Sequence, residues 1–242
     1  MYYENDMEKL KNLILKAVNF TGYTISRSDY SRLYSVLNQF DIDLVLDVGA
    51  NIGQFGSSLR ASGYKGKIVS FEPLEDAHTQ LKKLSKTDIK WKAHPRVAVG
   101  DCDGKIEINI AGNSESSSIL PMLELHSDVA KGSAYIGKVL VNIVKLDSVA
   151  QQYIHNSKSP FLKIDTQGYE WAVLDGSKEI LPRIKGILCE LSLVELYKGQ
   201  HLWIDILNRL ENEGFTLWSI QRGFTDRISG RTLQIDATFF RI

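Results

Sequence analysis

The sequence predicts an α/β fold built on a doubly wound, mainly parallel sheet, and three observations support that prediction. An apolar run at 44–48 leads into the turn 47–53, which reads DVGANIG. A second apolar run at 68–71 ends in the acid Glu72, and strand-like and helix-like stretches alternate after it. Alternating units of this kind favour a parallel sheet covered by helices on both faces.

Composition fits one domain of this type. The chain has 242 residues, 43% of them hydrophobic, which is enough for a single sizeable core. Lys plus Arg number 29, as do Asp plus Glu, so the chain is expected to bind neither nucleic acid nor an anionic membrane. We expect no membrane span and no signal peptide, because the N-terminus is acidic and no apolar stretch approaches roughly 18 residues. Cys102 and Cys189 lie far apart, which favours free thiols and a cytoplasmic location.

Two helices are predicted before the first strand. Apolar residues recur at helical spacing between 7 and 18, and Ser28 or Asp29 can cap a second helix that runs toward Phe40. Residues 1–40 are therefore expected to form an N-terminal helical cover. Residues 41–242 would then form the main domain of a compact whole.

The elements of the main domain follow in order. Strands of the sheet are predicted at 44–48, 67–72, 96–100, 161–165 and 184–191. Helices are predicted at 52–62, 74–85, 169–181 and 201–214. Strand-like patterns also occur at 105–110 and 139–146, and a short helix can begin at Asp147 or Ser148.

Two further segments depart from simple alternation. Residues 111–138 are irregular and rich in serine, and a stretch of this length is usually a functional or a disordered loop. The final strands, 215–220 and 237–242, follow each other without a helix between them. A short link of this kind requires an antiparallel partner, so the last strand is expected to run against its neighbours.

The glycine turn and Glu72 indicate a nucleoside-bearing cofactor. Glu72 lies 19 positions after Gly53, close to the separation of about 20 at which a carboxylate reaches a ribose hydroxyl. A dinucleotide loop would need glycines where this chain has Asn51 and Gln54, and no Lys or Arg lies near the turn to favour a phosphate. S-adenosylmethionine suits the site better, with its ribose on Glu72 and its ammonium near Asp47.

Carboxylates stand at or near the carboxyl ends of several predicted strands, where ligands of such sheets bind. They are Asp47, Glu72, Asp101, Asp165 and Glu190. Group transfer from such a cofactor needs a residue that takes or shares the proton of the acceptor, and Asp165 is the best candidate. Its alternative role is to cap the helix that begins near 169. Glu190 can hold a substrate hydroxyl, and no convincing metal set is predicted.

These residues resemble the FkbM family of S-adenosylmethionine-dependent methyltransferases, whose fold is Rossmann-like and of the class I methyltransferase type. The resemblance runs from about residue 43 to the C-terminus and rests on segments 47–53, 71–73, 98–104, 146–148 and 162–176. It implies O-methylation, often of sugar or polyketide hydroxyls. Many members read D-V-E-G where this chain has D-T-Q-G at 165–168, so Gln167 replaces a carboxylate.

The sequence thus predicts an S-adenosylmethionine-dependent O-methyltransferase for a sugar, glycan or similar polyhydroxylated acceptor. A nicotinamide-dependent oxidoreductase and a non-catalytic cofactor-binding protein remain alternatives. The candidate catalytic residues are Asp165 and Glu190. The candidate cofactor-binding residues are Asp47, Gly49, Ala50, Asn51, Gly53, Gln54, Phe55, Glu72, Pro73, Ala98, Asp101 and Asp165. The candidate acceptor-binding residues are Ser117, Gln167, Tyr169 and His201.

Overall fold

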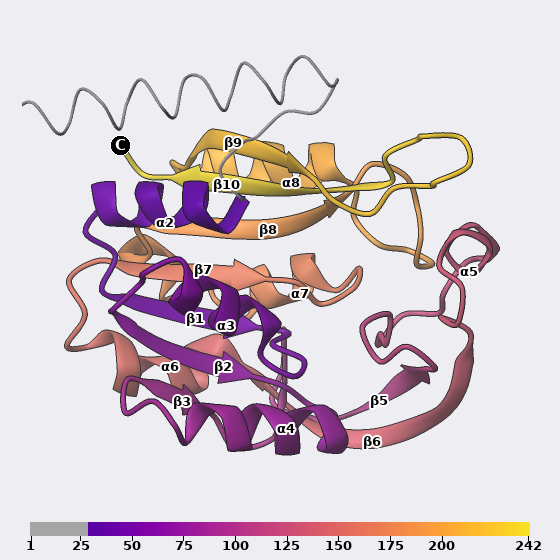
Figure 1. The fold of residues 1–242 in the computed structure, drawn as a ribbon, viewed down its shortest axis with the longest axis horizontal. Coiled ribbons are helices and arrows are strands. Elements are labelled where there is room, and N and C mark those ends of the chain that lie inside the picture. Colours follow the sequence, from indigo (N-terminus) through magenta and orange to yellow (C-terminus); the bar gives the residue numbers. More distant parts are fainter. Residues whose placement is uncertain (1–28) are drawn as a thin grey trace, which may run out of the picture.

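The computed structural model describes residues 29–242, so the helix predicted within 7–18 lies outside the described part of the chain. A seven-stranded sheet forms its centre, in the order β3-β2-β1-β7-β8-β10-β9 (Figure 1). Its strands are β1 (Leu44–Val48), β2 (Lys67–Phe71), β3 (Trp91–Ala93), β7 (Pro160–Ile164), β8 (Gly186–Ser192), β9 (Thr216–Arg222) and β10 (Gln234–Phe240). Neighbouring strands from β3 to β8 are parallel, whereas β10 runs antiparallel to both β8 and β9. The predicted doubly wound sheet with an antiparallel last strand is confirmed.

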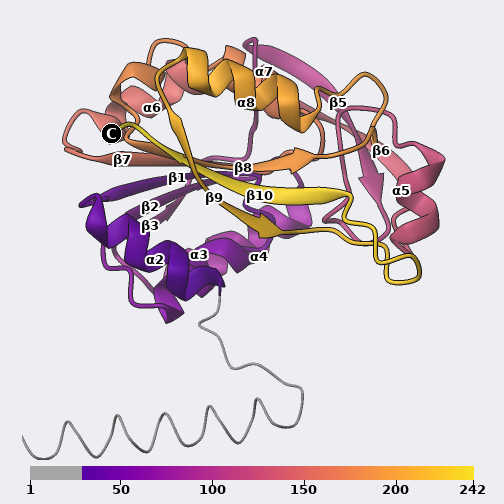
Figure 2. The ribbon, with the colours of Figure 1, turned by 90° about the horizontal axis from the view of Figure 1, so that it is seen from above.

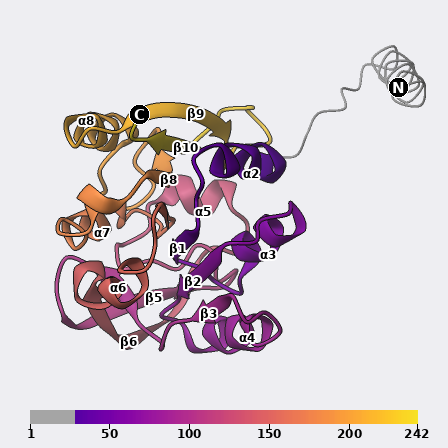
Figure 3. The same ribbon diagram turned by 90° about the vertical axis from the view of Figure 1, so that its left-hand side faces the viewer.

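Helices cover both faces of this sheet (Figures 2 and 3). One face carries α2 (Asp29–Gln39), α3 (Gln54–Ala61) and α4 (Glu75–Ser85), and the other carries α6 (Leu146–Ile154), α7 (Glu170–Asp175) and α8 (Trp203–Asn212). The second predicted cover helix is therefore present as α2. Its buried Leu33 and Leu37 belong to one apolar cluster with Val45, Phe161 and Leu188 of the sheet.

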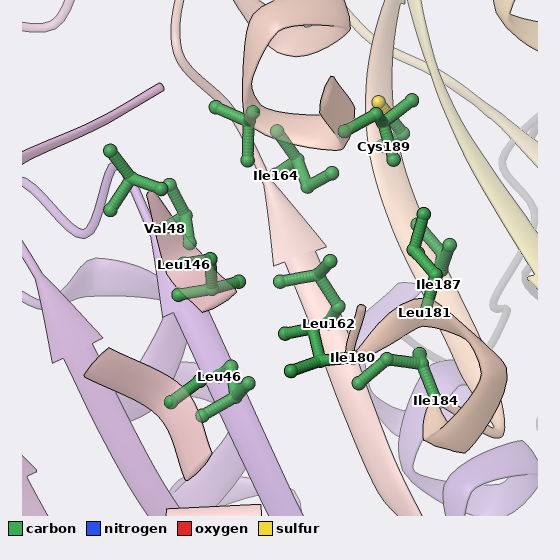
Figure 4. Packing of buried hydrophobic residues seen from close by; sticks show 14 of the residues in the cluster. Leu46, Val48, Leu146, Leu162, Ile164, Ile180, Leu181, Ile184, Ile187 and Cys189 are labelled. Atoms are coloured by element: carbon green, nitrogen blue, oxygen red, sulfur yellow. The ribbon is translucent and has the colours of Figure 1, made fainter. Parts of the chain in front are cut away.

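The opposite face holds the larger part of the core (Figure 4). Leu46 of β1, Leu162 of β7 and Ile187 of β8 alternate with the residues that face α2, so both faces of the central strands are apolar. Every residue of β1 and β7 is buried for this reason. Fully burying one such side chain contributes roughly 1.5–3 kcal/mol to stability.

A separate three-stranded sheet stands at the end toward which the parallel strands point, and it corrects one prediction. It has the order β4-β6-β5, from β4 (Ala98–Gly100), β5 (Gly104–Ala111) and β6 (Tyr135–Lys145). The strand predicted at 96–100 is thus not part of the main sheet, whose third strand is the unpredicted β3. Only three residues long, β3 has no periodic pattern to detect, whereas the apolar run around β4 resembles a core strand.

Residues 111–138 are more regular than predicted. They contain the short helix α5 (Glu124–Val129) and the start of β6. Asn109 and Ser118 exchange backbone hydrogen bonds, at 2.9 and 3.1 Å, which closes the loop between them. The helix predicted at 169–181 is also shorter, because α7 ends at Asp175 and a 3-10 turn, Leu181–Arg183, follows.

Candidate active site

A cavity of about 410 Å³ opens at the carboxyl ends of the parallel strands. Its walls come from the turns after β1, β2 and β7, from the second sheet, and from the loop that contains Ser117. Residues of α2, β8, β9 and β10 extend it on the other side. The cavity therefore lies where the strand-end carboxylates predicted a site.

The turn after β1 requires glycine at 49. Gly49 has φ of +73°, and a Cβ built on it would lie 1.7 Å from the carbonyl oxygen of Asp165. The backbone N–H groups of Gly49 and Ala50 both donate to the carbonyl of Phe71, at 3.1 and 3.0 Å. This turn is consequently packed against the ends of both neighbouring strands, β2 and β7.

Glu72 is held in place by the same turn. Its Oε2 accepts a hydrogen bond from the Asn51 N–H and its Oε1 one from the Leu74 N–H, both at 2.8 Å. Only 5% of Glu72 is exposed, and burial raises the pKa of its carboxyl to about 7. Each oxygen retains a lone pair for a hydroxyl donor from the cavity.

Asp47 is engaged by a buried lysine. It is fully buried beneath the cavity, where Ser70 Oγ donates to its Oδ2 at 2.9 Å and Lys163 Nζ lies 3.4 Å from its Oδ1. Lys163 also donates to the Gly49 carbonyl at 2.9 Å and lies 3.5 Å from Asp165. The two carboxylates raise the pKa of Lys163 despite its burial. Asp47 therefore holds Lys163 in place and does not line the cavity, so its predicted contact with the cofactor stays a prediction.

Gln167 joins the two predicted catalytic carboxylates. Its Nε2 donates to Asp165 Oδ1 at 2.9 Å and to Glu190 Oε2 at 2.8 Å. The hydroxyl of Tyr197 donates to Gln167 Oε1 at 2.9 Å, which orients the amide. Gln234 donates to the same oxygen of Glu190 at 2.7 Å. A glutamate at 167 would have no N–H to donate to Asp165 or Glu190. The glutamine of the D-T-Q-G sequence therefore provides the donor that both carboxyl groups need.

The environment of Glu190 disfavours its charge. Burial and the nearby Asp165 carboxylate raise the pKa of Glu190 well above its usual range. Asp165, by contrast, lies next to the Lys163 ammonium and has a side chain that is 36% exposed to the cavity side. Gln167 thus holds a buried carboxyl group, whose charge is disfavoured, beside the partly exposed carboxyl group of Asp165.

Most of the predicted residues line the cavity. They are Gly49, Ala50, Asn51, Gln54, Phe55, Glu72, Pro73, Ala98, Ser117, Asp165, Gln167 and Glu190. Ser117 Oγ accepts a hydrogen bond from the Ala111 N–H at 3.0 Å, and Gln54 donates to Glu115 at 3.0 Å. These contacts hold the serine-rich loop beside the turn after β1.

The other predicted residues lie outside the cavity, Asp47 among them. Gly53 begins α3 with φ of +94° and packs against side chains of α4 and β3, so it supports the turn from behind. The hydroxyl of Tyr169 donates a hydrogen bond of 3.4 Å to Asp101 Oδ1, beside the second sheet. His201 stacks on Trp171 at the start of α8, with ring centroids 4.0 Å apart. None of these five residues lines the cavity, and the ligand contacts predicted for them stay predictions.

The sequence analysis missed many residues of the cavity wall, and four of them, from α2, β9 and β10, could not have been found from local patterns. Tyr30 comes from α2, Gln221 and Arg222 from β9, and Asp236 from β10. Their presence depends on the order of the last strands and on how α2 packs, which no local pattern gives. Lys163 had a visible signal, since a lysine inside an otherwise apolar strand needs a buried partner.

The strand order β3-β2-β1-β7-β8-β10-β9, with a cavity beyond the carboxyl ends of the parallel strands, is that of the predicted class I methyltransferase fold. The model of the methyltransferase FkbM domain matches residues 47–217, and the chain belongs to that family. No curated protein matches the sequence.

Solved structures resemble the fold at low sequence identity. TehB from Haemophilus influenzae is 9% identical with a TM-score of 0.49, and the match covers 91% of this chain and 63% of the TehB chain. An rRNA methylase from Streptococcus thermophilus is 13% identical with a TM-score of 0.47, covering 91% and 99%. A TehB-like SAM-dependent methyltransferase from Corynebacterium glutamicum is 13% identical with a TM-score of 0.44, and the match covers 100% of this chain and 98% of the other.

None of the helices described here has the length and apolar character of a membrane span.

Proposed function

We propose that this protein is an S-adenosylmethionine-dependent O-methyltransferase that acts on a hydroxyl of a sugar, a glycan or a similar polyhydroxylated molecule. The observation that carries the proposal is the presence in one cavity of Glu72 and the bridged pair Asp165 and Glu190. The first suits a ribose, and the second suits proton transfer from an acceptor.

The cavity wall fits this cofactor. Glu72 has lone pairs for the two ribose hydroxyls, and the nearby Val99, Ile108 and Ile119 provide apolar surface for a flat base. Lys163 is engaged by two carboxylates and two backbone carbonyls, which leaves it unsuited to a pyrophosphate. These features favour a nucleoside without phosphates.

The cofactor residues that we propose are the predicted ones that line the cavity after β1, β2 and β7 and on β4. They are Gly49, Ala50, Asn51, Gln54, Phe55, Glu72, Pro73, Ala98 and Asp165. Bound S-adenosylmethionine supplies an electrophilic methyl group on a sulfonium. Glu72 would orient the ribose, and the rigid turn at Gly49 would keep the cofactor in line with the acceptor.

Asp165 is the proposed base. Its carboxylate would accept the proton of the acceptor hydroxyl as the oxygen attacks the methyl group, a role worth about 10²–10⁴-fold in rate. Lys163 and Gln167 hold Asp165 by an ion pair of 3.5 Å and a hydrogen bond of 2.9 Å. Glu190, kept next to the base by Gln167, would bind the acceptor hydroxyl or share its proton.

We also propose that residues 1–40 act as a cover on the methyltransferase domain at 41–242. Support comes from α2, whose Leu33 and Leu37 pack on the sheet and whose Tyr30 lines the cavity. A cover in this place would help to exclude water during transfer.

The test is transfer of a labelled methyl group from S-adenosylmethionine to a panel of neutral saccharides, followed by mapping of the label. We expect label on a hydroxyl oxygen of at least one saccharide, with turnover that depends on Asp165. Efficient labelling of amines or aromatic hydroxyls, with none on saccharides, would contradict the proposed acceptor class.

A further inference from the structure

The cavity continues past the catalytic carboxylates toward the antiparallel edge of the sheet. Glu190 on β8 is paired with Asp236 on β10, and Asp236 is paired with Gln221 on β9. Side chains directly opposite each other on neighbouring strands point to the same face. This row therefore faces α2, which Figures 1 and 3 show beside the same strands.

Asp236 is a carboxylate without a partner in this part of the cavity. It is half-buried and lines the cavity, yet its carboxylate makes no hydrogen bond or ion pair with any of the described residues. Burial and the nearby Asp165 raise the pKa of Asp236 to about 6. A carboxylate that is shielded in this way and faces a cavity is available to accept hydrogen bonds from a ligand.

Tyr30 lies across the cavity from this row. It is on the first turn of α2, its ring lies 6.0 Å from that of Phe55, and 37% of its surface is exposed. Within residues 29–242 its hydroxyl has no hydrogen-bond partner either. Leu33 and Leu188 add apolar surface to the same wall. We call this end of the cavity, lined by Asp236 and Tyr30, the lobe. It combines the face of an aromatic ring, apolar side chains, and a carboxylate and a hydroxyl that have no hydrogen-bond partner among the described residues.

The charges around this lobe argue against an anionic ligand. Among the described residues that line the cavity, the cationic side chains are Lys163 and Arg222. Lys163 is engaged by Asp47 and Asp165, and Arg222 donates to Thr225, Thr232 and the Gly230 carbonyl. Arg222 keeps its charge, since its partners are neutral oxygens, but six carboxyl groups line the same cavity, Asp236 among them. A phosphate or a carboxylate would therefore meet an excess of negative charge.

The order of the strands places this lobe on the opposite side of Asp165 from Glu72. Glu72 follows β2, and Asp236 lies four strands away, a distance of about 19 Å at roughly 4.8 Å per strand. Asp165 and Glu190 lie between them, on β7 and β8 or directly after. A ribose on Glu72 thus puts the acceptor on the far side of the base, over β8 and β10.

We propose that Asp236 and Tyr30 form the acceptor subsite and that it selects an uncharged sugar. Two neighbouring hydroxyls of the sugar donate to the Asp236 carboxylate, while the ring of Tyr30 packs on its C–H face. Amide groups such as Gln221 complete the polar wall. This inference rests on the proposed function, because it assumes that the nucleoside occupies the Glu72 end.

The test uses the full chain saturated with S-adenosylhomocysteine and measures sugar binding by saturation-transfer NMR and calorimetry. The probes are the methyl glycosides of glucose, galactose, mannose, fucose and rhamnose, compared with glucuronate, glucose 6-phosphate and glucosamine. The variants are Asp236→Asn, Tyr30→Leu and, as a matched control, Asp128→Asn on the exposed surface of α5.

We expect at least one neutral glycoside to bind, with an affinity about tenfold weaker in Asp236→Asn and in Tyr30→Leu and unchanged in Asp128→Asn. Affinity for S-adenosylhomocysteine should stay within about twofold in all three, because these residues lie outside its proposed end of the cavity. Preference for a charged sugar, no binding of any neutral glycoside, or equal affinity in Asp236→Asn would overturn the inference and leave the methyltransferase assignment standing. Failure of the wild type to bind S-adenosylhomocysteine would overturn both.

Discussion

Replacing Gly49 by alanine tests whether the turn after β1 is fixed by its contact with β7. Gly49 and Gly230 both have φ of +73°. A Cβ on Gly49 would lie 1.7 Å from the Asp165 carbonyl oxygen, whereas a Cβ on Gly230 has nothing within 4 Å. The pair therefore separates the cost of the backbone conformation from the cost of the close approach.

The expected loss can be estimated from these two terms. A left-handed conformation costs an alanine about 1–2 kcal/mol, and this applies to both variants. Relief of the overlap requires the Asp165 backbone to move, and overpacking of this kind typically costs about 1–3 kcal/mol more. Gly49→Ala should therefore lose about 2–5 kcal/mol of unfolding free energy, against about 1–2 kcal/mol for Gly230→Ala.

Urea unfolding followed by tryptophan fluorescence measures the loss of unfolding free energy in both glycine variants. Gly49→Ala should also weaken binding of S-adenosylhomocysteine, because the same backbone shapes the cavity and carries Asp165. Gly230→Ala should leave this affinity unchanged. Equal losses of stability in the two variants, with equal affinity, would refute the reasoning that the turn is fixed by Asp165.

Three further outcomes follow from the site. Because bound hydroxyls favour the ionised form of Glu72, whose pKa is raised to about 7, affinity for S-adenosylhomocysteine should be about tenfold lower at pH 6 than at pH 8; a flat profile in calorimetry would contradict this. Lys163→Met leaves the buried Asp47 uncompensated and should cost about 3–5 kcal/mol of unfolding free energy, part of which Asp47→Asn should restore in the double variant; no restoration would argue against the pair. Asp165→Asn should lower turnover by about 10²–10⁴-fold and change cofactor affinity much less, because the amide keeps the size and one acceptor oxygen of the carboxylate. An unfolded variant with no specific kinetic effect would instead support a capping role.

The strand-end acids explain how much of the site the sequence could predict. Glu72, Asp165 and Glu190 each follow or end an apolar run, so their common edge of the sheet could be inferred from the chain alone. Asp47 has the same pattern but a different role, because Lys163 lies opposite it on the neighbouring strand. Pairing between strands that are far apart in sequence is not visible in either run.

Sheet order limited the rest of the prediction. Tyr30 and Asp236 meet at the cavity because β10 is inserted between β8 and β9 and α2 packs on that face. His201 stands at the start of α8, on the opposite face, so its position in a loop gave no guide to the cavity. The three-residue β3 lacked a pattern, and β4 took its place in the predicted sheet because its run is equally apolar.

The central claim is that the cavity binds a nucleoside without phosphates through Glu72, and calorimetry with S-adenosylhomocysteine and NAD tests it most directly. The wild type should bind S-adenosylhomocysteine and show no heat of binding with NAD. Glu72→Gln, which keeps one acceptor oxygen for the turn, should weaken S-adenosylhomocysteine by roughly 1.5–3 kcal/mol, or about 10- to 150-fold in affinity. Tight binding of NAD with no response to S-adenosylhomocysteine would contradict the account.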